Sequence, residues 1–216
     1  MKRIVAISDQ HGFLPPIPEC DFLVISGDIC PVRGSHHPDD QWKWLDTKFR
    51  TWLEEIPAKH VIACAGNHDF VFEHYARDIH PRKLRWNYLQ DSGIELDGVK
   101  FWGTPWQPWF YAWAFNAPEK NGEDFLAEKF AMVPEDTDVV ICHGPPRGFG
   151  DKATRDERTG STALLKRMRE VNPRYLFCGH IHEDRGIYEP AGFTCVNASI
   201  VNERYELVHN PFELVI

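Results

Sequence analysis

Five short apolar runs rich in branched residues recur along the chain, and each is too short to form a helix. Runs of this length between polar residues are typical of strands that are buried on both faces of a sheet. They cover residues 4–7, 22–25, 61–65, 139–142 and 175–178. Segments of alternating polarity predict further strands, at residues 94–96, 99–102, 186–189, 193–197 and 212–215.

Three other segments have the hydrophobic spacing of amphipathic helices. Apolar side chains at intervals of three and four predict a helix over residues 41–56, with Asp39 or Asp40 as its N-cap. The same spacing predicts a second helix over residues 162–171, and a weaker pattern predicts a third over residues 124–132. Strands and helices therefore alternate before strands dominate the last part of the chain.

This alternation predicts an α/β fold with mixed sheets. The chain has 216 residues, the length of one domain, and no internal repeat or Gly/Ser-rich linker divides it. We therefore expect a single domain over residues 1–216. Hydrophobic residues make up 43% of the chain and charged residues 26%, which excludes a disordered or coiled-coil protein.

The net charge and the placement of the cysteines indicate which binding partners and which cellular compartment to expect. The formal net charge of −8 argues against long duplex nucleic acid as a partner. No apolar stretch approaches the roughly 20 residues of a membrane-spanning helix, and the N-terminal run is too short for a secretion signal. The six cysteines lie far apart without a CxxC pair, which indicates reduced thiols. These features predict a cytoplasmic protein with no membrane association.

The candidate chemistry follows the apolar runs, because a cluster containing Asp, His or Asn comes directly after each of the five. Ligands of α/β sheets bind beyond the carboxyl ends of the strands, so five neighbouring strands would bring these clusters together. Any one of these residues alone is more often a helix cap, a turn former or a surface histidine. Their repeated placement favours one common site, formed by Asp9, His11, Asp28, Asn67, His143, His180 and His182.

Carboxylate, amide and imidazole donors without thiolates suit hard or borderline divalent ions. Seven such donors are too many for one tetrahedral zinc ion and suit two ions that share one carboxylate. We therefore expect two divalent metal ions as cofactors, with manganese as the first expectation and iron, zinc or magnesium as alternatives.

In chain order, the clusters form the motifs DxH, GD, GNHD, H and GHxH between Asp9 and His182. This order resembles the calcineurin-like metallophosphoesterases. The stretches WGTPWQPWF, HGPP, GHIHE and VNAS resemble most closely the small metallophosphoesterase-domain-containing group, which is similar to class III phosphodiesterases. The resemblance implies a β-sandwich of two mixed sheets flanked by helices in a four-layer αββα arrangement. Many relatives carry another Asp in the second motif, where this chain has Ile29, Cys30 and Pro31, so the protein-phosphatase branch fits less well.

The resemblance also implies a role for each residue of the site. One ion would be held by Asp9, His11, Asp28 and His182. The other would be held by Asp28, Asn67, His143 and His180, so that Asp28 bridges the two ions. His68 would act as the catalytic residue at the leaving-group oxygen or the phosphate, with Asp69 orienting its ring.

Two aspartates and two divalent ions leave a small positive charge, even after a bridging hydroxide, the expected nucleophile, is counted. This charge suits a singly charged phosphodiester slightly better than a monoester. We therefore expect a metal-dependent hydrolase of phosphodiesters, such as cyclic nucleotides or other small phosphate esters. A phosphomonoesterase, a nuclease and a non-catalytic scaffold on the same fold are the alternatives.

Two further segments are candidates for contacts with a small phosphoester or nucleotide. The basic loop, residues 147–158, follows His143 and offers Arg147, Lys152 and Arg155 for a second phosphate, unless it is only a solvated loop. The aromatic segment, residues 101–115, contains eight aromatic residues. They would form a core layer, stack a nucleobase beside the metals through side chains such as Trp106, or build a homo-oligomer interface.

Overall fold

The computed structural model describes residues 1–32, 36–75 and 84–216, and its first sheet contains five strands in the order β11-β1-β2-β3-β4. The strands are β1 (Arg3–Ile7), β2 (Cys20–Ser26), β3 (Ala58–Cys64), β4 (Asn87–Tyr88) and β11 (Phe212–Val215). The first four run parallel, and β11 pairs antiparallel with β1. The carboxyl ends of β1, β2 and β3 therefore lie at one edge of this sheet.

The second sheet contains six strands in the order β5-β6-β7-β8-β10-β9. They are β5 (Ser92–Leu96), β6 (Val99–Thr104), β7 (Val139–Cys142), β8 (Tyr175–Cys178), β9 (Gly186–Tyr188) and β10 (Thr194–Asn197). The four central strands are parallel, and the two edge strands are antiparallel to their neighbours. Both sheets are thus mixed, as predicted.

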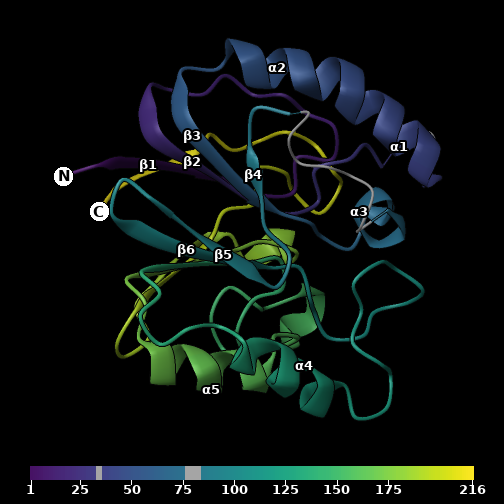
Figure 1. The fold of residues 1–216 in the computed structure, drawn as a ribbon. Helices are drawn as coiled ribbons and strands as arrows, with labels where there is room; N and C mark the ends of the chain where they lie inside the picture. Colours follow the sequence, from purple (N-terminus) through teal and green to yellow (C-terminus); the bar gives the residue numbers. More distant parts are fainter. Residues whose placement is uncertain (33–35, 76–83) are drawn as a thin grey trace.

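Helices cover the outer face of each sheet (Figure 1). The helices beside the first sheet are α1 (Pro38–Trp44), the π-helix η1 (Leu45–Phe49), α2 (Arg50–Glu55) and the short α3 (Phe70–His74). Those beside the second sheet are α4 (Gly122–Ala131) and α5 (Thr162–Val171). Two single 3₁₀ turns are η3 (Thr154–Asp156) and η4 (His182–Asp184). The predicted four-layer αββα arrangement is confirmed.

Three apolar cores separate the four layers. In β1, Ile4 and Ala6 belong to the core between the two sheets, whereas Val5 and Ile7 belong to the core beneath α1 and α2. The third core lies between the second sheet and α4 and α5. Because successive side chains of a strand point to opposite faces, strands buried on both faces consist of continuous apolar runs. This explains why the five apolar runs predicted the central strands.

The predicted helix over residues 41–56 differs from the structure at its start and in its middle. It begins at Pro38, and its N-cap is His37, whose Nδ1 accepts a hydrogen bond from the Asp39 N–H at 3.3 Å. Asp39 and Asp40 lie in the first turn instead, where the positive end of the helix dipole favours carboxylates. The middle of the segment is the π-helix η1, so the regular α-helical prediction was wrong there.

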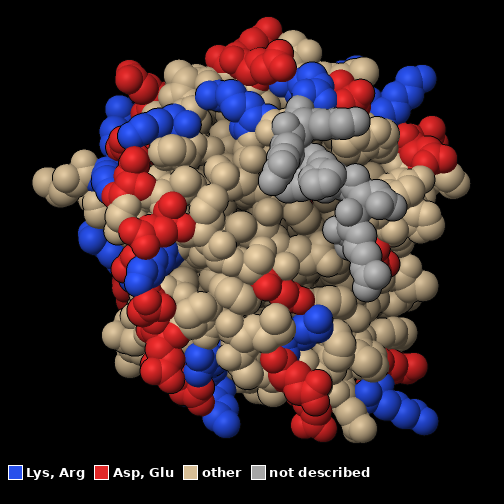
Figure 2. All heavy atoms as spheres, in the orientation of Figure 1, with Lys and Arg blue, Asp and Glu red and all other residues tan. Residues whose placement is uncertain are grey.

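Other features of the chain agree with the sequence-based expectations. All six cysteines are free and buried, as expected for reduced thiols. Within the three described ranges, no helix has both the length and the apolar character needed to cross a membrane. On the face shown in Figure 2, basic and acidic side chains are intermixed along the edges, and the centre of this face is mainly uncharged.

Candidate metal centre

The polar clusters that follow the central strands meet at one end of the sandwich, as predicted. The loops after β1, β2 and β3 come from the first sheet, and those after β7 and β8 come from the second. The structure brings together all seven predicted ligands, which are buried or partly buried: Asp9, His11, Asp28, Asn67, His143, His180 and His182. The site therefore lies where both sheets end.

The backbone at this site is strained. Asp9, His11, Asp28 and His180 all have positive φ angles, of 56°, 44°, 51° and 69°. Residues other than glycine rarely adopt this left-handed conformation, and such strain concentrates at functional sites. Gly66 precedes Asn67 where a Cβ atom would collide with the Asp28 carboxylate, which explains the glycine of the GNHD motif.

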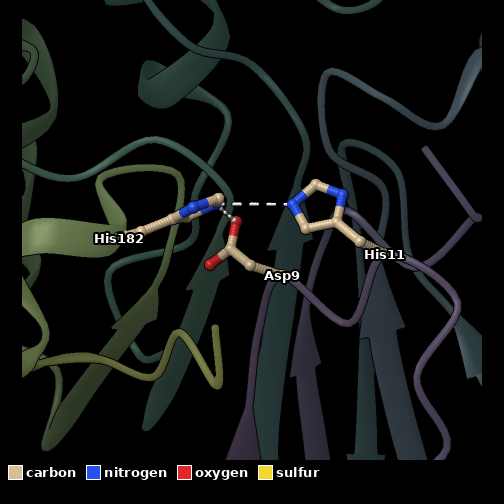
Figure 3. A group of neighbouring side chains, drawn as sticks. All are labelled: Asp9, His11 and His182. Carbon is tan, nitrogen blue, oxygen red and sulfur yellow. Dashed lines mark hydrogen bonds and ion pairs between the residues drawn. The ribbon is translucent and has the colours of Figure 1, made fainter. Parts of the chain in front are cut away.

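Asp9, His11 and His182 form the first group of donor atoms (Figure 3). Nε2 of His182 lies 3.3 Å from Oδ1 of Asp9 and 3.4 Å from Nε2 of His11. Nδ1 of His182 donates a hydrogen bond to the carbonyl of Asn202 at 3.1 Å. A neutral imidazole has only one N–H, so Nε2 of His182 carries a lone pair directed at the other donors.

The Asp28 carboxylate lies between the donor groups of the site. Its Oδ1 is 3.4 Å from Nε2 of His143, and its Oδ2 is 3.7 Å from Nε2 of His11. Oδ1 also accepts a hydrogen bond from the backbone N–H of His68 at 2.8 Å. The two oxygens of Asp28 thus face donors that come from different sheets.

Asn67, His143 and His180 complete the arrangement. Oδ1 of Asn67 lies 2.8 Å from Nε2 of His143 and 2.7 Å from Nδ1 of His180. Nδ1 of His143 donates to the carbonyl of Ser26 at 2.8 Å, so a neutral His143 directs its lone pair at the amide oxygen of Asn67. Two acceptors facing each other at this distance require a proton or a cation between them.

Burial and the charges of neighbouring groups together set the pKa values of the aspartates and histidines in this site. Burial disfavours the charge on Asp28, but the neighbouring histidines outweigh this and hold its pKa well below the ordinary value. Burial also disfavours charge on His143, but Asp28 raises the pKa of His143 to about 9. For His11 and His180, burial dominates and lowers each pKa to about 3. Without metal, a proton on His143 therefore offsets the negative charge of Asp28.

This donor set fits two divalent ions. The imidazole and carboxylate donor atoms lie close to one another, and buried Nδ1 of His11 has no partner within the described residues. Asp9 and Asp28 each belong to two of the three buried His/Asp groups. Shared carboxylates of this kind are typical of two-metal sites, so the clusters are consistent with a dinuclear centre.

His68 lies beside this cluster, with its Nε2 3.9 Å from Oδ2 of Asp28. Its side chain is only 6% exposed, and its ring packs on Trp113 with 4.2 Å between the ring centroids. In the described part of the chain, no group forms a hydrogen bond with Nδ1 of His68. Burial lowers the pKa of His68, although Asp28 partly opposes this shift, so the ring is neutral near pH 7.

Asp69 forms no hydrogen bond with Nδ1 of the His68 ring in the described structure, and its expected role in orienting that ring stays a prediction. Its carboxylate accepts hydrogen bonds from the backbone N–H groups of Ile29, Cys30 and Gly66, at distances between 2.8 and 3.1 Å. Asp69 therefore connects the loop after β2 to the loop after β3. Burial and the charge of Asp28 raise the pKa of Asp69 to about 6, although these hydrogen bonds oppose the shift.

Gln41 supports the GNHD loop from the other side, and sequence reasoning missed it. This buried residue of α1 donates to the carbonyl of His68 at 2.7 Å and accepts from the N–H of Val71 at 2.9 Å. The amphipathic pattern gave no signal for it, because a glutamine on a helix is normally assigned to the solvent-facing side.

A pocket of about 470 Å³ opens over the cluster, and Asp28, Asn67, His68, His180 and His182 all contribute to its lining. Its outer wall contains Trp109 and Phe110 of the aromatic segment and Glu157 of the basic loop. No sequence pattern indicated its other members, Glu183, Glu203 and Tyr205.

Among the side chains that the structure describes, neither Arg147 nor Lys152, which were predicted as substrate contacts, lines this pocket. Arg147 is exposed, and Lys152 forms an ion pair with Asp156 at 2.8 Å. Arg155 belongs to η3, and its side chain lies outside the described part of the structure. Two of the four cations in the loop, Lys152 and Arg158, pair with acidic residues of the same loop, which its net charge does not reveal.

The aromatic segment divides into several environments. Phe101 and Phe115 are buried in the cores, whereas Trp109 and Phe110 are about half exposed and line the pocket. Trp106 does not line the pocket, because its indole N–H donates to Asp91 at 2.9 Å and its ring packs against Phe125. A subunit interface through this segment stays a prediction.

Comparison with known proteins gives a consistent result. The model of the family described as calcineurin-like phosphoesterase matches residues 2–184. Metallophosphoesterase domain-containing protein 1 of Homo sapiens is 35% identical over 97% of this chain and 69% of its own length. The 3',5'-cyclic adenosine monophosphate phosphodiesterase CpdA of Escherichia coli is 26% identical over 77% of this chain and 56% of its own length. The crystal structure of TT1561 of Thermus thermophilus aligns with a TM-score of 0.56 and 14% identity, covering 91% of this chain and 88% of that one, which supports the fold alone.

Proposed function

This chain belongs to the calcineurin-like phosphoesterase family, and from that premise we propose that it hydrolyses phosphodiester bonds in small substrates with two divalent metal ions. Cyclic nucleotides and other small phosphate esters are the substrate class we propose. The observation that carries the proposal is the convergence of buried, inward-facing lone pairs at Asp9, Asp28 and their histidine neighbours.

The family resemblance implies the ligands of each ion, and the distances between the donor atoms support this assignment. One ion would be held by Asp9, His11, Asp28 and His182. The other would be held by Asp28, Asn67, His143 and His180. This assignment makes Asp28 the shared ligand, which is supported by its two oxygens facing His143 and His11. Manganese is the metal we propose, because it accepts this mixture of oxygen and imidazole donors.

Two ions held by these residues would lower the pKa of water towards neutrality and offset the charge of the phosphoryl oxygens. During hydrolysis, the oxygen of water forms a bond to phosphorus and gives up a proton, while the bond from phosphorus to the leaving oxygen breaks and that oxygen keeps the electron pair and takes up a proton. His68 lies at the pocket beside Asp28 and has a nitrogen without a partner in the described structure, so we assign it to this leaving oxygen, as a proton or hydrogen-bond donor.

The charge of the pocket supports a diester over a monoester. The described lining includes three glutamates and neither lysine nor arginine. A monoester near pH 7 carries nearly two negative charges, whereas a diester carries one and is repelled less by these carboxylates. The E. coli relative, which is named as a cyclic nucleotide phosphodiesterase, also favours a diester.

The alternatives receive less support. A nuclease for long duplexes would need a broad basic track, whereas the charges on the face in Figure 2 are intermixed and the net charge is −8. A scaffold without catalysis would not need the strained, inward-facing donors described above. We propose a cytoplasmic setting because all six cysteines are buried and free.

The test is hydrolysis of a matched aryl phosphodiester and aryl phosphomonoester by metal-stripped protein to which manganese, iron, zinc or magnesium is returned separately. The proposal predicts metal-dependent turnover with a higher kcat/KM for the diester. A higher kcat/KM for the monoester would overturn the diester assignment, and no turnover with any of the metals would favour the scaffold.

A further inference from the structure

The outer wall of the pocket combines aromatic rings with carboxylates. The aromatic residues are Trp109, Phe110 and Tyr205, and the carboxylates are Glu157, Glu183 and Glu203. This composition is unusual for a site that acts on phosphate esters, which commonly use arginine or lysine to bind phosphate oxygens. The wall lies next to the metal cluster, because Asp28, His180 and His182 line the same pocket.

Among the side chains that the structure describes, the cations Lys152, Arg158 and Arg204 do not neutralise these glutamates. Lys152 is paired with Asp156 at 2.8 Å, and Arg158 is paired with Asp151 at 2.7 Å. The contact of Arg204 with Glu203 is long, at 3.9 Å, and both side chains are more than half exposed, so it contributes little. The wall therefore retains negative charge around its aromatic rings.

Tyr205 joins the wall to the metal cluster. Its ring centroid is 4.8 Å from that of His11 and 5.2 Å from that of His182, with the rings edge to face. Its φ angle of 60° is strained for a bulky residue. The turn that holds it is fixed by Asn202, whose side chain accepts hydrogen bonds from the backbone of Arg204 and Glu206.

The ring of Tyr205 also lies near His68, with 6.1 Å between the two ring centroids. His68 also lines the pocket, and its buried Nδ1 has no hydrogen-bond partner in the described ranges. Buried polar atoms without partners are rare in folded proteins and call for a ligand or water.

Resting on the proposed function, we infer that the preferred substrate is a phosphodiester in which one of the two ester groups carries an alkylammonium cation. The phosphate would lie at the metal cluster, and the cation would lie against the rings of Trp109, Phe110 and Tyr205. Aromatic faces attract quaternary ammonium groups, and the three glutamates add charge complementarity. An ester group that is neutral or anionic would gain neither the attraction of the aromatic faces nor the attraction of the glutamates.

The test compares p-nitrophenyl phosphorylcholine with its neutral analogue, in which a carbon atom replaces the ammonium nitrogen, on the manganese-loaded protein. The phosphate charge and the leaving group are identical, so the cation is the only difference. We expect a kcat/KM about ten-fold higher for the choline diester, with the difference falling as salt rises. Equal values for the two diesters would overturn the inference and leave the proposed function intact.

If neither diester is hydrolysed with any metal, the proposed function fails, and binding then tests the inference separately. Choline and its neutral carbon analogue are titrated into metal-free protein and followed by ligand-observed NMR. Preferential binding of choline would support the cation pocket without catalysis. Equal binding, or none, would contradict it.

A double substitution tests the carboxylates directly. Glu157→Gln with Glu203→Gln is expected to lower the preference for the choline diester several-fold. The matched control is Glu119→Gln with Glu128→Gln, which removes two exposed carboxylates outside the pocket and should preserve the preference. An equal loss in both variants would show that only overall charge matters and would overturn the role of the wall.

Discussion

Nε2 of His11 and Nε2 of His182 face each other across 3.4 Å. Because Nδ1 of His182 donates to the Asn202 carbonyl, its Nε2 has a lone pair and no proton when the ring is neutral. Two ring nitrogens in this arrangement need a proton or a cation between them. On the other side of Asp28, Oδ1 of Asn67 and Nε2 of His143 also face each other and also need a proton or a cation between them. This second pair supports two metal ions.

Asp28→Asn should weaken retention of both ions. An amide keeps the volume of the carboxylate but removes the charge that faces His11 and His143. Mutation of a residue that only supports a metal ligand typically lowers metal affinity or activity by about 10–100-fold. Loss of a ligand that both ions share should therefore lower diester turnover by more than about 100-fold. Metal analysis after gel filtration, with exposed Asp124→Asn as the control, checks this result. Full retention of two ions would contradict the bridging role of Asp28.

His68→Ala should leave both ions bound and lower kcat by roughly 100- to 10,000-fold, the range for loss of a proton donor. The matched control is His74→Ala, since His74 is an exposed histidine of the adjacent α3. Because the His68 ring packs on Trp113, His68→Gln should be measured too, to separate catalysis from packing. Loss of metal in both His68 variants would instead identify His68 as a ligand.

Asp69→Asn should destabilise the fold. The substitution replaces one of the oxygens that accept from Ile29, Cys30 and Gly66 with an NH₂ group, leaving buried N–H groups without acceptors. We expect a loss of about 1–3 kcal/mol in the free energy of unfolding, measured with urea, together with weaker metal retention. If Asp69 oriented His68 instead, the variant would lose activity with its stability unchanged.

The stability of the metal-free protein should fall as pH rises from 6.5 to 9. Burial lowers the pKa of His143, but Asp28 outweighs burial and raises it from 6.5 to about 9. The folded state therefore binds this proton more tightly than the unfolded state. This contribution is fully present below pH 6.5 and is lost as pH approaches 9. His11 and His180, whose pKa values are about 3, stay neutral in the folded protein over this window.

Urea unfolding of the metal-free protein should give a free energy of unfolding that is lower at pH 9 than at pH 6.5, by on the order of 3 kcal/mol. His143→Asn should abolish most of this slope, and bound manganese should reverse it, because the metal requires the neutral imidazole. A metal-free protein whose stability rises with pH across this window would contradict the pairing of protonated His143 with Asp28.

The sequence predicted the parts of the fold and site that depend on local pattern. Strands buried on both faces have apolar runs, and the polar clusters after them met at one edge because parallel strands end together. Asp69 could not be assigned its role in this way, because its partners are backbone N–H groups of two different loops. Tyr205 was missed because it lies in a short turn far along the chain from the other residues of the site.

The basic loop shows what a count of charged residues cannot reveal about contacts with a substrate. Its cations were counted correctly, but Lys152 and Arg158 pair with acidic residues of the same loop. Such pairing depends on the three-dimensional path of the loop, which has little regular structure. Glu157 of this loop lines the pocket, whereas Lys152 and Arg158 do not.

The most direct test of the central claim is a titration of metal-stripped protein with manganese, in which bound metal and aryl phosphodiester turnover are measured on the same samples. We predict two bound ions per chain, with turnover that appears as both sites fill and that is absent from the Asp28→Asn variant. Diester turnover by the metal-stripped protein would contradict the proposed two-metal mechanism. A titration that shows no specific binding of manganese would contradict it too.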